Sequence, residues 1–384
     1  MYKLLILITT ITYFITIILF NNFLGFAICI LLTSLIFSFA KRKFISNHFF
    51  LFIKNNKGLA ALLFLTLAFI LFTFNLFRVK SNIEYVFKNN GELMIQTSDG
   101  FKELYKTEGD ILSNEIFSNE NTNIQSIEIK RKNESLIHTI ENFFNPNKII
   151  IIEFNSKNNY SLTADTKNDL APINTSKALK FSNSNFAVNT NFYGESAIGE
   201  IIIKKKRYGK ADKKASGYFK VIDGKPIVGA KSLFNKNLGT VSYSCQAFPS
   251  VMKNGIMFSY INSEKSPYKK SWKLKTYRNL MGTIKNGNFI CILSHSGGLL
   301  SVKEIATIAK KYGVTNASLF DGGAALQYEY NSKDFHLRFS ALNNTFDFGE
   351  MVDKKFITLG NSHFPTKSPV FLTVEHLTTK PQLH

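Results

Sequence analysis

Residues 299–323 read LLSVKEIATIAKKYGVTNASLFDGG, and the spacing of their apolar residues changes from helical to strand-like within the stretch. In the first half, Ser301 and Glu304 have the spacing of a capping box at a helix start. Gly313 stands where a glycine commonly ends a helix. The short apolar run ASLF then predicts a strand that ends at Asp321. A helix that leads into a strand predicts a domain containing both elements.

Upstream of this stretch, short runs rich in Val, Ile, Phe and Tyr are separated by Gly, Asn or Asp, which is typical of strands joined by turns. The strand candidates are KIIIIEF (148–154), FAVNTNF (186–192), GEIIIKK (199–205), GYFKVID (217–223), TVSYS (240–244), GIMFSYI (255–261) and NGNFICILS (286–294). We therefore expect an α+β fold: a strand-dominated mixed sheet domain with few helices over residues 148–365. A C-terminal tail would follow over residues 366–384.

The N-terminal part of the chain contains three apolar stretches, near residues 4–20, 23–40 and 59–77. A bilayer-spanning helix needs roughly 20 apolar residues, and a signal peptide would explain one stretch rather than three. We therefore expect a membrane anchor of three transmembrane helices over residues 1–80. Lys and Arg without any acid lie between the second and third stretches. Because cytoplasmic loops carry such an excess, we expect a multi-pass protein of the cell membrane with its C-terminal domain on the extracytoplasmic side.

The formal net charge is +20, which can indicate nucleic acid or an anionic surface as a partner. The basic residues are scattered, except in the run KKKRYGKADKK at 204–214. This run has no recognised nucleic-acid motif, so we expect no nucleic-acid partner. It is either a solvated loop or a contact with anionic lipid or polymer. Residues 81–147 are polar, with short alternating runs, and predict a membrane-proximal extension of strands and loops.

Two cysteines, Cys245 and Cys291, fall within strand candidates of the main domain. No Cys-x-x-Cys pair or Cys/His cluster is present, so the sequence does not support a zinc site. An extracytoplasmic location would permit a disulfide between them. Two separate buried thiols are the alternative.

The most informative polar group is Asp321, which follows an apolar run and precedes Gly322 and Gly323. Two glycines allow backbone or ligand to approach a carboxylate closely, although Asp-Gly is also a common turn pair. Arg278 stands before an apolar stretch, where a guanidinium could bind phosphate in a bidentate manner. The alternative for Arg278 is an ordinary surface cation.

Three further polar residues stand at or near the ends of strand candidates: Asn189, Gln246 and His295. Asn189 could orient a hydroxyl-rich ligand or form an Asx turn. His295 could be a general acid or base or a loop residue. The chain has no G-x-S-x-G element, so acyl transfer by a standard triad is unsupported.

The order of these features over roughly residues 148–335 resembles the phosphodiester glycosidase family. In that family an Asn-Gly-Gly-Phe-Phe, a Gln-Ser-Gly-Pro-like, an Arg-Thr-Ala-Ile-Gly and a Leu-Asp-Gly-Gly-Gly-Ser element follow one another. Here they correspond to elements at Asn189, Gln246, Arg278 and Asp321. The chain departs from the family inside each element, through Thr190-Asn191, Ala247-Phe248, Asn279-Leu280-Met281 and Ala324-Ala325.

Together with the expected membrane anchor, the resemblance implies a membrane-anchored hydrolase that cleaves a sugar-phosphodiester (glycosidic) bond in a surface or cell-wall glycan. It implies catalytic roles for Asp321, Arg278 and His295. It implies substrate binding by Asn189, Gln246, Gly322 and Gly323. A second carboxylate is open among Glu195, Glu200 and Asp212.

The implied partners are a carbohydrate phosphodiester and, through the N-terminal stretches, membrane lipid. No cofactor and no metal ligands are identified, and a divalent cation is left open. Because the departures fall where the family has small residues, a non-catalytic, membrane-tethered glycopolymer-binding protein of the same fold is the alternative.

Overall fold

The structure is a computed structural model, and it describes residues 91–108, 110–133, 146–192, 197–234, 239–262, 272–341 and 367–377. The three stretches expected to cross the membrane lie outside these residues. Across the described ranges, no helix is long and apolar enough to span a membrane.

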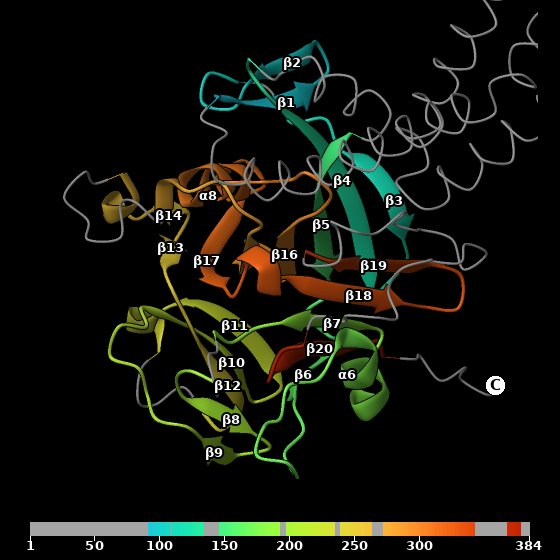
Figure 1. The fold of residues 1–384 in the computed structure, drawn as a ribbon, viewed down its shortest axis with the longest axis vertical. Coiled ribbons are helices and arrows are strands. Elements are labelled where there is room, and N and C mark those ends of the chain that lie inside the picture. The colour runs from blue at the N-terminus through green and yellow to red at the C-terminus, as the bar shows by residue number, and fades with distance from the viewer. Residues whose placement is uncertain are drawn as a thin grey trace, which may run out of the picture. The chain divides into compact units, whose positions relative to one another are not determined.

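The largest sheet has ten strands (Figure 1). They are β1 (Leu93–Thr97), β2 (Gly100–Glu103), β3 (Asn114–Ser118), β4 (Thr122–Arg131), β5 (Asn147–Phe154), β13 (Ser250–Lys253), β14 (Ile256–Met257), β15 (Asn279–Ile284), β16 (Phe289–Ser294) and β17 (Val314–Phe320). Their order is β14-β13-β17-β15-β16-β5-β4-β1-β2, with β3 paired to β4.

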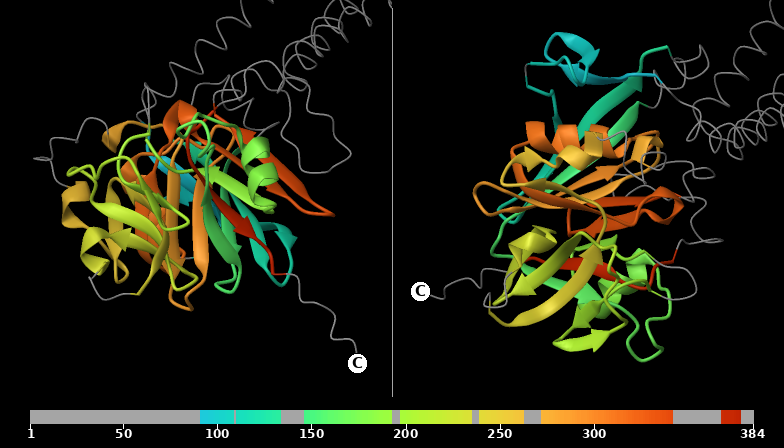
Figure 2. Two further views of the ribbon diagram at one scale, coloured as in Figure 1. Left: turned by 90° about the horizontal axis from the view of Figure 1, so that it is seen from below. Right: turned by 90° about the vertical axis from the view of Figure 1, so that its left-hand side faces the viewer.

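Two five-stranded sheets complete the described fold (Figure 2). One has the order β11-β10-β12-β8-β9 and the other β19-β18-β7-β20-β6. The bounds are β6 (Asn159–Thr163), β7 (Phe186–Asn189), β8 (Ile201–Ile203), β9 (Lys206–Tyr208), β10 (Gly217–Ile222), β11 (Lys225–Ala230), β12 (Val241–Ala247), β18 (Gln327–Asn331), β19 (His336–Ser340) and β20 (Phe371–Glu375).

Every strand pair among the described residues is antiparallel. The α+β class and the dominance of strands are confirmed, but the prediction of mixed sheets is wrong. The physical reason is that short turns join many neighbouring strands, such as β15 to β16 and β18 to β19, and a short turn reverses the chain.

The run KIIIIEF forms β5 in the interior of the large sheet, where side chains on both faces are covered. Ile150 and Ile152 point into a core shared with the two smaller sheets. Ile149 and Ile151 point into a second core on the opposite face. Burial on both faces explains why the strand is continuously apolar rather than alternating.

The second core is covered by the helix α8 (Val302–Lys311). The predicted capping box is present, because Glu304 N–H donates to Ser301 Oγ and Ser301 N–H donates to the Glu304 carboxylate. Gly313 has a φ of 69°, as expected of a glycine after a helix end. The remaining helical elements are α6 (Thr175–Ser182) and the 3-10 turns η2 (Lys231–Leu233), η3 (Ser259–Asn262) and η4 (Gly323–Ala325).

Buried salt bridges connect the strand β4 to α8. Arg131 at the end of β4 donates to both carboxylate oxygens of Glu304, at 2.5 and 3.1 Å, and Lys275 Nζ lies 2.7 Å from the same carboxylate. Burial alone would raise the pKa of Glu304, but Arg131 and Lys275 outweigh it and lower the pKa to about 2. Glu304 therefore remains ionised inside the protein at neutral pH.

The domain boundaries predicted near 147 and 366 do not separate structural units among the described residues. β4, from the expected extension, pairs along its length with β5. β20, from the expected tail, pairs with both β6 and β7.

The candidate GIMFSYI forms the two-residue strand β14 followed by η3. Cys245 and Cys291 are free and buried, which decides between the two alternatives for these thiols.

Candidate active site

The antiparallel order brings three chain segments to one end of the large sheet. β16 and β17 both pair with β15 and therefore run parallel to each other, with α8 as the crossover between them. Asn279, the first residue of β15, lies opposite Phe320 of β17 and Leu293 of β16. Arg278, before β15, and Asp321, after β17, consequently lie at the same end of these two strands.

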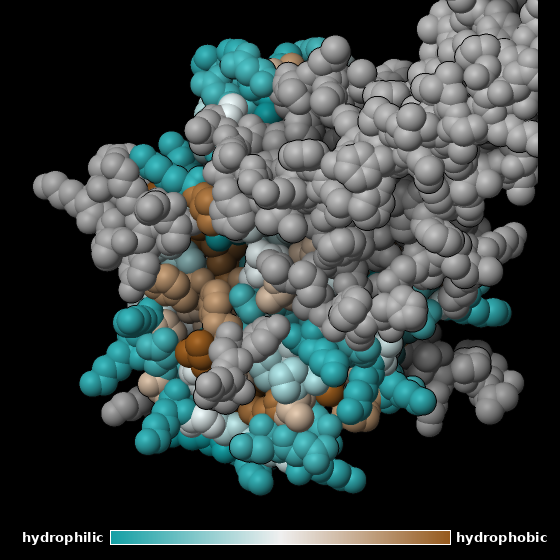
Figure 3. Space-filling view, viewed as in Figure 1, coloured by the Kyte–Doolittle hydropathy of each residue, from teal (hydrophilic) through white to brown (hydrophobic). Residues whose placement is uncertain are grey.

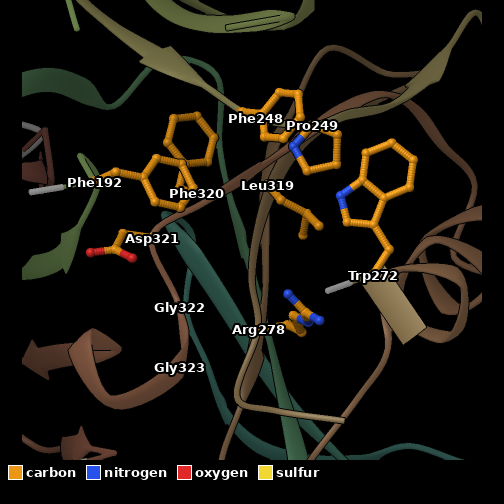
Figure 4. A pocket seen from close by; sticks show the side chains of 10 residues that line it. All are labelled: Phe192, Phe248, Pro249, Trp272, Arg278, Leu319, Phe320, Asp321, Gly322 and Gly323. Atoms are coloured by element: carbon orange, nitrogen blue, oxygen red, sulfur yellow. The ribbon is translucent and has the colours of Figure 1, made fainter. Parts of the chain in front are cut away.

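A pocket of about 230 Å³ lies at this end of the strands (Figure 4). Four of the residues predicted from the sequence line it, namely Asp321, Arg278, Gly322 and Gly323. The other lining residues are Phe192, Phe248, Pro249, Trp272, Leu319 and Phe320. Asp321 and Arg278 are therefore the ionisable side chains of a mostly apolar pocket.

Asp321 is a partly exposed carboxylate in largely apolar surroundings. Burial raises its pKa from 3.8 to about 7, and the Gly322 N–H, which donates a hydrogen bond to it, offsets this only in part. Near neutral pH the group is thus present in both protonation states. A carboxyl with a pKa close to the working pH is suited to general acid or base catalysis.

The main chain of Asp321 is fixed from two sides. Its N–H donates to Thr190 O at 3.0 Å, and its carbonyl accepts from Asn189 Nδ2 at 2.9 Å and from Asn279 Nδ2 at 3.3 Å. Asn189 Oδ1 also accepts from the Gln327 N–H at 3.0 Å. Asn189 is fully buried behind Asp321 and is not a pocket-lining residue, so the geometry assigns its amide to positioning.

Asn279 is a site residue that the sequence analysis did not single out. It is fully buried, it bridges the carbonyls of Asn189 and Asp321, and its Oδ1 has no hydrogen-bond partner among the described residues. An amide with an unsatisfied buried oxygen costs free energy. The sequence feature that could have indicated Asn279 was its position directly after Arg278, where the family has Thr.

Arg278 is held by two backbone carbonyls. Its Nε donates to Leu300 O at 2.9 Å, and its Nη2 donates to Leu274 O at 2.8 Å. Burial lowers the pKa of the guanidinium to about 10, so it carries its charge at neutral pH. In Figure 4, Arg278 lies towards Trp272, whereas Asp321 lies beside Phe192 and Phe320. A ligand in the pocket can therefore meet a cation and a carboxyl group at different points.

The two glycines allow the loop after β17 to pass close to the start of β15. A Cβ on Gly322 would lie 2.5 Å from the carbonyl oxygen of Tyr277, a distance that side chains do not adopt. The N–H of Gly323 donates to that same carbonyl at 2.8 Å. The predicted need for small residues beside Asp321 is thus a need for close backbone approach.

Gln246 and His295 do not line the pocket. Gln246 is occupied by the main chain, because its Oε1 accepts from the N–H groups of Glu200 and Asp212 and its Nε2 donates to Asp212 O. His295 is buried, with Nδ1 2.6 Å from the hydroxyl of Tyr328.

Two of the three candidates for a second carboxylate, Glu200 and Asp212, are not among the pocket-lining residues either. Glu200 forms an ion pair with Arg207, and Asp212 accepts a hydrogen bond from the Lys214 N–H at 2.8 Å. Glu195 lies outside the described residues. No group of three or more His, Cys, Asp or Glu among the described residues could hold a metal ion.

The aromatic wall of the pocket was also missed, because its members come from separate segments. Phe192 follows β7, Phe248 follows β12, and Trp272 precedes β15. The Phe248 and Trp272 rings lie 6.1 Å apart. Aromatic faces in a pocket can bind the apolar face of a ring-shaped ligand.

Residues 182–351 match the family model of the phosphodiester glycosidases. This confirms the resemblance drawn from the sequence. Among solved structures, the chain is similar to the zebrafish N-acetylglucosamine-1-phosphodiester alpha-N-acetylglucosaminidase catalytic domain, auto-inhibited by pro-peptide. That chain is 13% identical with a TM-score of 0.48, and the match covers 69% of this chain and 87% of that one.

A hypothetical protein from Synechocystis is 10% identical with a TM-score of 0.44, over 74% of this chain and 68% of that one. No curated protein matches the chain at a significant level.

Two departures from the family pattern have structural roles here. Thr190 Oγ1 donates to Val370 O at 3.2 Å, and Asn191 Nδ2 donates to Ile198 O at 3.1 Å. Both side chains are fully buried and neither lines the pocket. These substitutions therefore support the site from behind rather than filling it.

Proposed function

We propose that the chain is a hydrolase that cleaves the bond between the anomeric carbon of a sugar and a phosphodiester. The observation that carries the proposal is Asp321, a carboxyl with a pKa of about 7 in the same pocket as the cationic Arg278. The match of residues 182–351 to the phosphodiester glycosidases supports the same reaction class.

In the proposed reaction, Arg278 binds the phosphate and stabilises the charge that develops on it as the glycosidic bond breaks. The C1–O bond breaks with its electron pair going to the phosphate oxygen, and a water oxygen bonds to C1. Asp321, when ionised, accepts the proton that this water loses. The products are a free sugar and a phosphate monoester. A phosphate is a good leaving group, so it needs less help from an acid than a sugar alcohol does.

His295 has no direct part in this proposal, and Asn189 and Gln246 act by positioning main chain around the pocket. We further propose a membrane-anchored enzyme whose domain acts on a surface or cell-wall glycan outside the cell. The three apolar stretches in the N-terminal part of the sequence and the basic residues between the second and third support that location.

The test uses the full-length chain and a panel of sugar 1-phosphodiesters that includes N-acetylglucosamine 1-(methyl phosphate). Free reducing sugar is measured. We expect Asp321→Asn to lower kcat at least 100-fold, since it removes the catalytic base. The control is Asp334→Asn, which changes an exposed carboxylate on the β18–β19 turn. Equal rates for the parent and Asp321→Asn would refute the assignment.

The second candidate function is a non-catalytic glycopolymer binder. It is favoured by buried side chains such as Thr190, which stand behind the pocket where the family has glycine. It predicts quenching of fluorescence from Trp272, the single tryptophan, by a sugar 1-phosphodiester without release of sugar. Detection of free sugar with the parent protein would reject it.

A further inference from the structure

Residues 199–214 comprise β8, β9 and the loop that follows, and we refer to them as the basic hairpin. Its segment 204–214 contains seven Lys or Arg and a single acid, Asp212. In Figure 3, hydrophilic residues are frequent, among some hydrophobic ones, in the lower part of the surface where Figure 1 places these two strands. This concentration of charge is not used by the proposed reaction.

The cations of the basic hairpin are available to a partner. The exposed residues are Lys204, Lys205, Lys206, Arg207, Lys210, Lys213 and Lys214. The acids nearby neutralise little of this charge: Glu200 pairs with Arg207, and the Asp212 carboxylate accepts from a backbone N–H. Clustered like charges repel one another and create a strong local potential that attracts an anion.

The two ends of the basic hairpin, which we call its base (residues 198–200 and 209–212), are hydrogen-bonded to segments of the pocket wall. The Ile198 N–H, just before the hairpin, donates to the carbonyl of the pocket residue Phe192 at 2.8 Å. Gln246 then fixes both sides of the base, through Oε1 bonds of 2.7 Å from the N–H groups of Glu200 and Asp212. Two residues after Gln246 the chain reaches Phe248, on the pocket wall.

Close backbone contact keeps the two sides of this base together. A Cβ on Gly209 would lie 2.5 Å from the carbonyl oxygen of Gly199, so only glycine fits there. The basic hairpin is thus hydrogen-bonded at residues 198, 200 and 212 to the segments that carry Phe192 and Phe248 of the pocket wall.

We propose that the basic hairpin binds successive phosphates of a polyanionic glycan, so that the substrate is a chain of sugar phosphodiesters rather than a single unit. This inference rests on the proposed function for the pocket. It also gives Gln246 a role, as the residue that positions the hairpin relative to the pocket. An anionic lipid surface would offer similar charge, and the test separates the two sources.

The experiment compares two fourfold variants of the full-length chain. The hairpin variant carries Lys204→Gln, Lys205→Gln, Lys210→Gln and Lys213→Gln. The control variant has the same change in net charge at exposed positions elsewhere, through Lys157→Gln, Lys167→Gln, Lys180→Gln and Lys285→Gln. Each protein is assayed on a soluble polymer of N-acetylglucosamine 1-phosphate and on the single-unit methyl phosphodiester, at low and high salt.

We expect the hairpin variant to lose about 16-fold in kcat/KM on the polymer, because each of four exposed ion pairs contributes a factor of roughly two. Hydrolysis of the single unit and all rates of the control variant should be unchanged. High salt should remove the difference on the polymer, since screening weakens exposed charge pairs. An equal loss on polymer and single unit, or an equal loss in both variants, would overturn the inference.

Binding is measured separately, by fluorescence anisotropy of labelled polymer and by sedimentation with phosphatidylglycerol vesicles. If the parent binds the polymer but hydrolyses neither substrate, the proposed reaction fails, and weaker polymer binding by the hairpin variant still supports the inference. If the hairpin variant loses vesicle binding yet binds and cleaves the polymer as the parent does, the hairpin contacts lipid and the inference is wrong.

Discussion

Replacing Asp321 by Asn should stabilise the folded chain at neutral pH, although it removes the proposed catalytic group. The carboxyl has a pKa of about 7 in the fold against an ordinary value of 3.8, because burial disfavours its charge. A carboxyl with a raised pKa holds a proton in the folded state that it has already lost in the unfolded state. Stability therefore falls as the pH rises from about 4 to about 7, and stays low above it.

The size of the effect follows from the two pKa values. At about 1.4 kcal/mol for each pH unit between them, a fully buried carboxyl would lose about 4 kcal/mol. Asp321 is partly exposed at the pocket, so solvent screening reduces this. We expect the Asn variant to be about 2 kcal/mol more stable than the parent at pH 8, with little difference at pH 4.

Urea unfolding, followed by the fluorescence of the single tryptophan, measures this difference at a series of pH values. Asp334→Asn is the matched control, because its carboxylate is exposed, and it should show no such pH dependence. A variant that is no more stable than the parent at pH 8, or that gains as much at pH 4, would refute the reasoning. The same carboxyl predicts that kcat/KM rises with pH and levels off above about 7, since the base acts when ionised.

Three further substitutions test the surroundings of the pocket. Glu304→Gln leaves Arg131 buried without its ion-pair partner and should cost roughly 3 kcal/mol at pH 7; because the pKa of Glu304 is lowered, the difference in urea unfolding should shrink as the pH falls from about 4 towards 2. Gly322→Ala places a methyl group 2.5 Å from Tyr277 O and should cost roughly 2 kcal/mol, measured in the same way. Arg278→Gln should lower kcat/KM on a sugar 1-phosphodiester about 100-fold, since it removes the charge that meets the phosphate; an unchanged rate would remove Arg278 from the mechanism.

The sequence predicted those parts of the fold that depend on local pattern. The capping box of Ser301 and Glu304 and the buried strand 148–154 both form as expected. The pairing of β20 with β6 and β7 was missed, because the partners are far apart in the sequence and only tertiary contacts select them.

The residues of the candidate site likewise include some that local sequence indicates and others that only the folded chain brings together. Asp321 and Arg278 were recognisable because each adjoins a strand end and a glycine-containing element. The hydrogen bonds of Asn189 and Asn279 to the Asp321 carbonyl, and the aromatic wall, depend on segments that meet only in the folded chain. Residue type alone could not distinguish an amide that contacts a ligand from one that holds the backbone behind it.

The position of β20 also affects how the protein is made. Thr163 of β6 and Thr373 of β20 are hydrogen-bonded across a separation of 210 residues, and β7 likewise requires β20 as a neighbour. Until residues 367–377 have been synthesised, β6 and β7 each have an unpaired edge that other chains could join. Val370 O also accepts the N–H of Thr190, whose carbonyl in turn accepts the N–H of Asp321. The nascent chain therefore passes through a long, association-prone stage during which its proposed catalytic residue is not yet held in place.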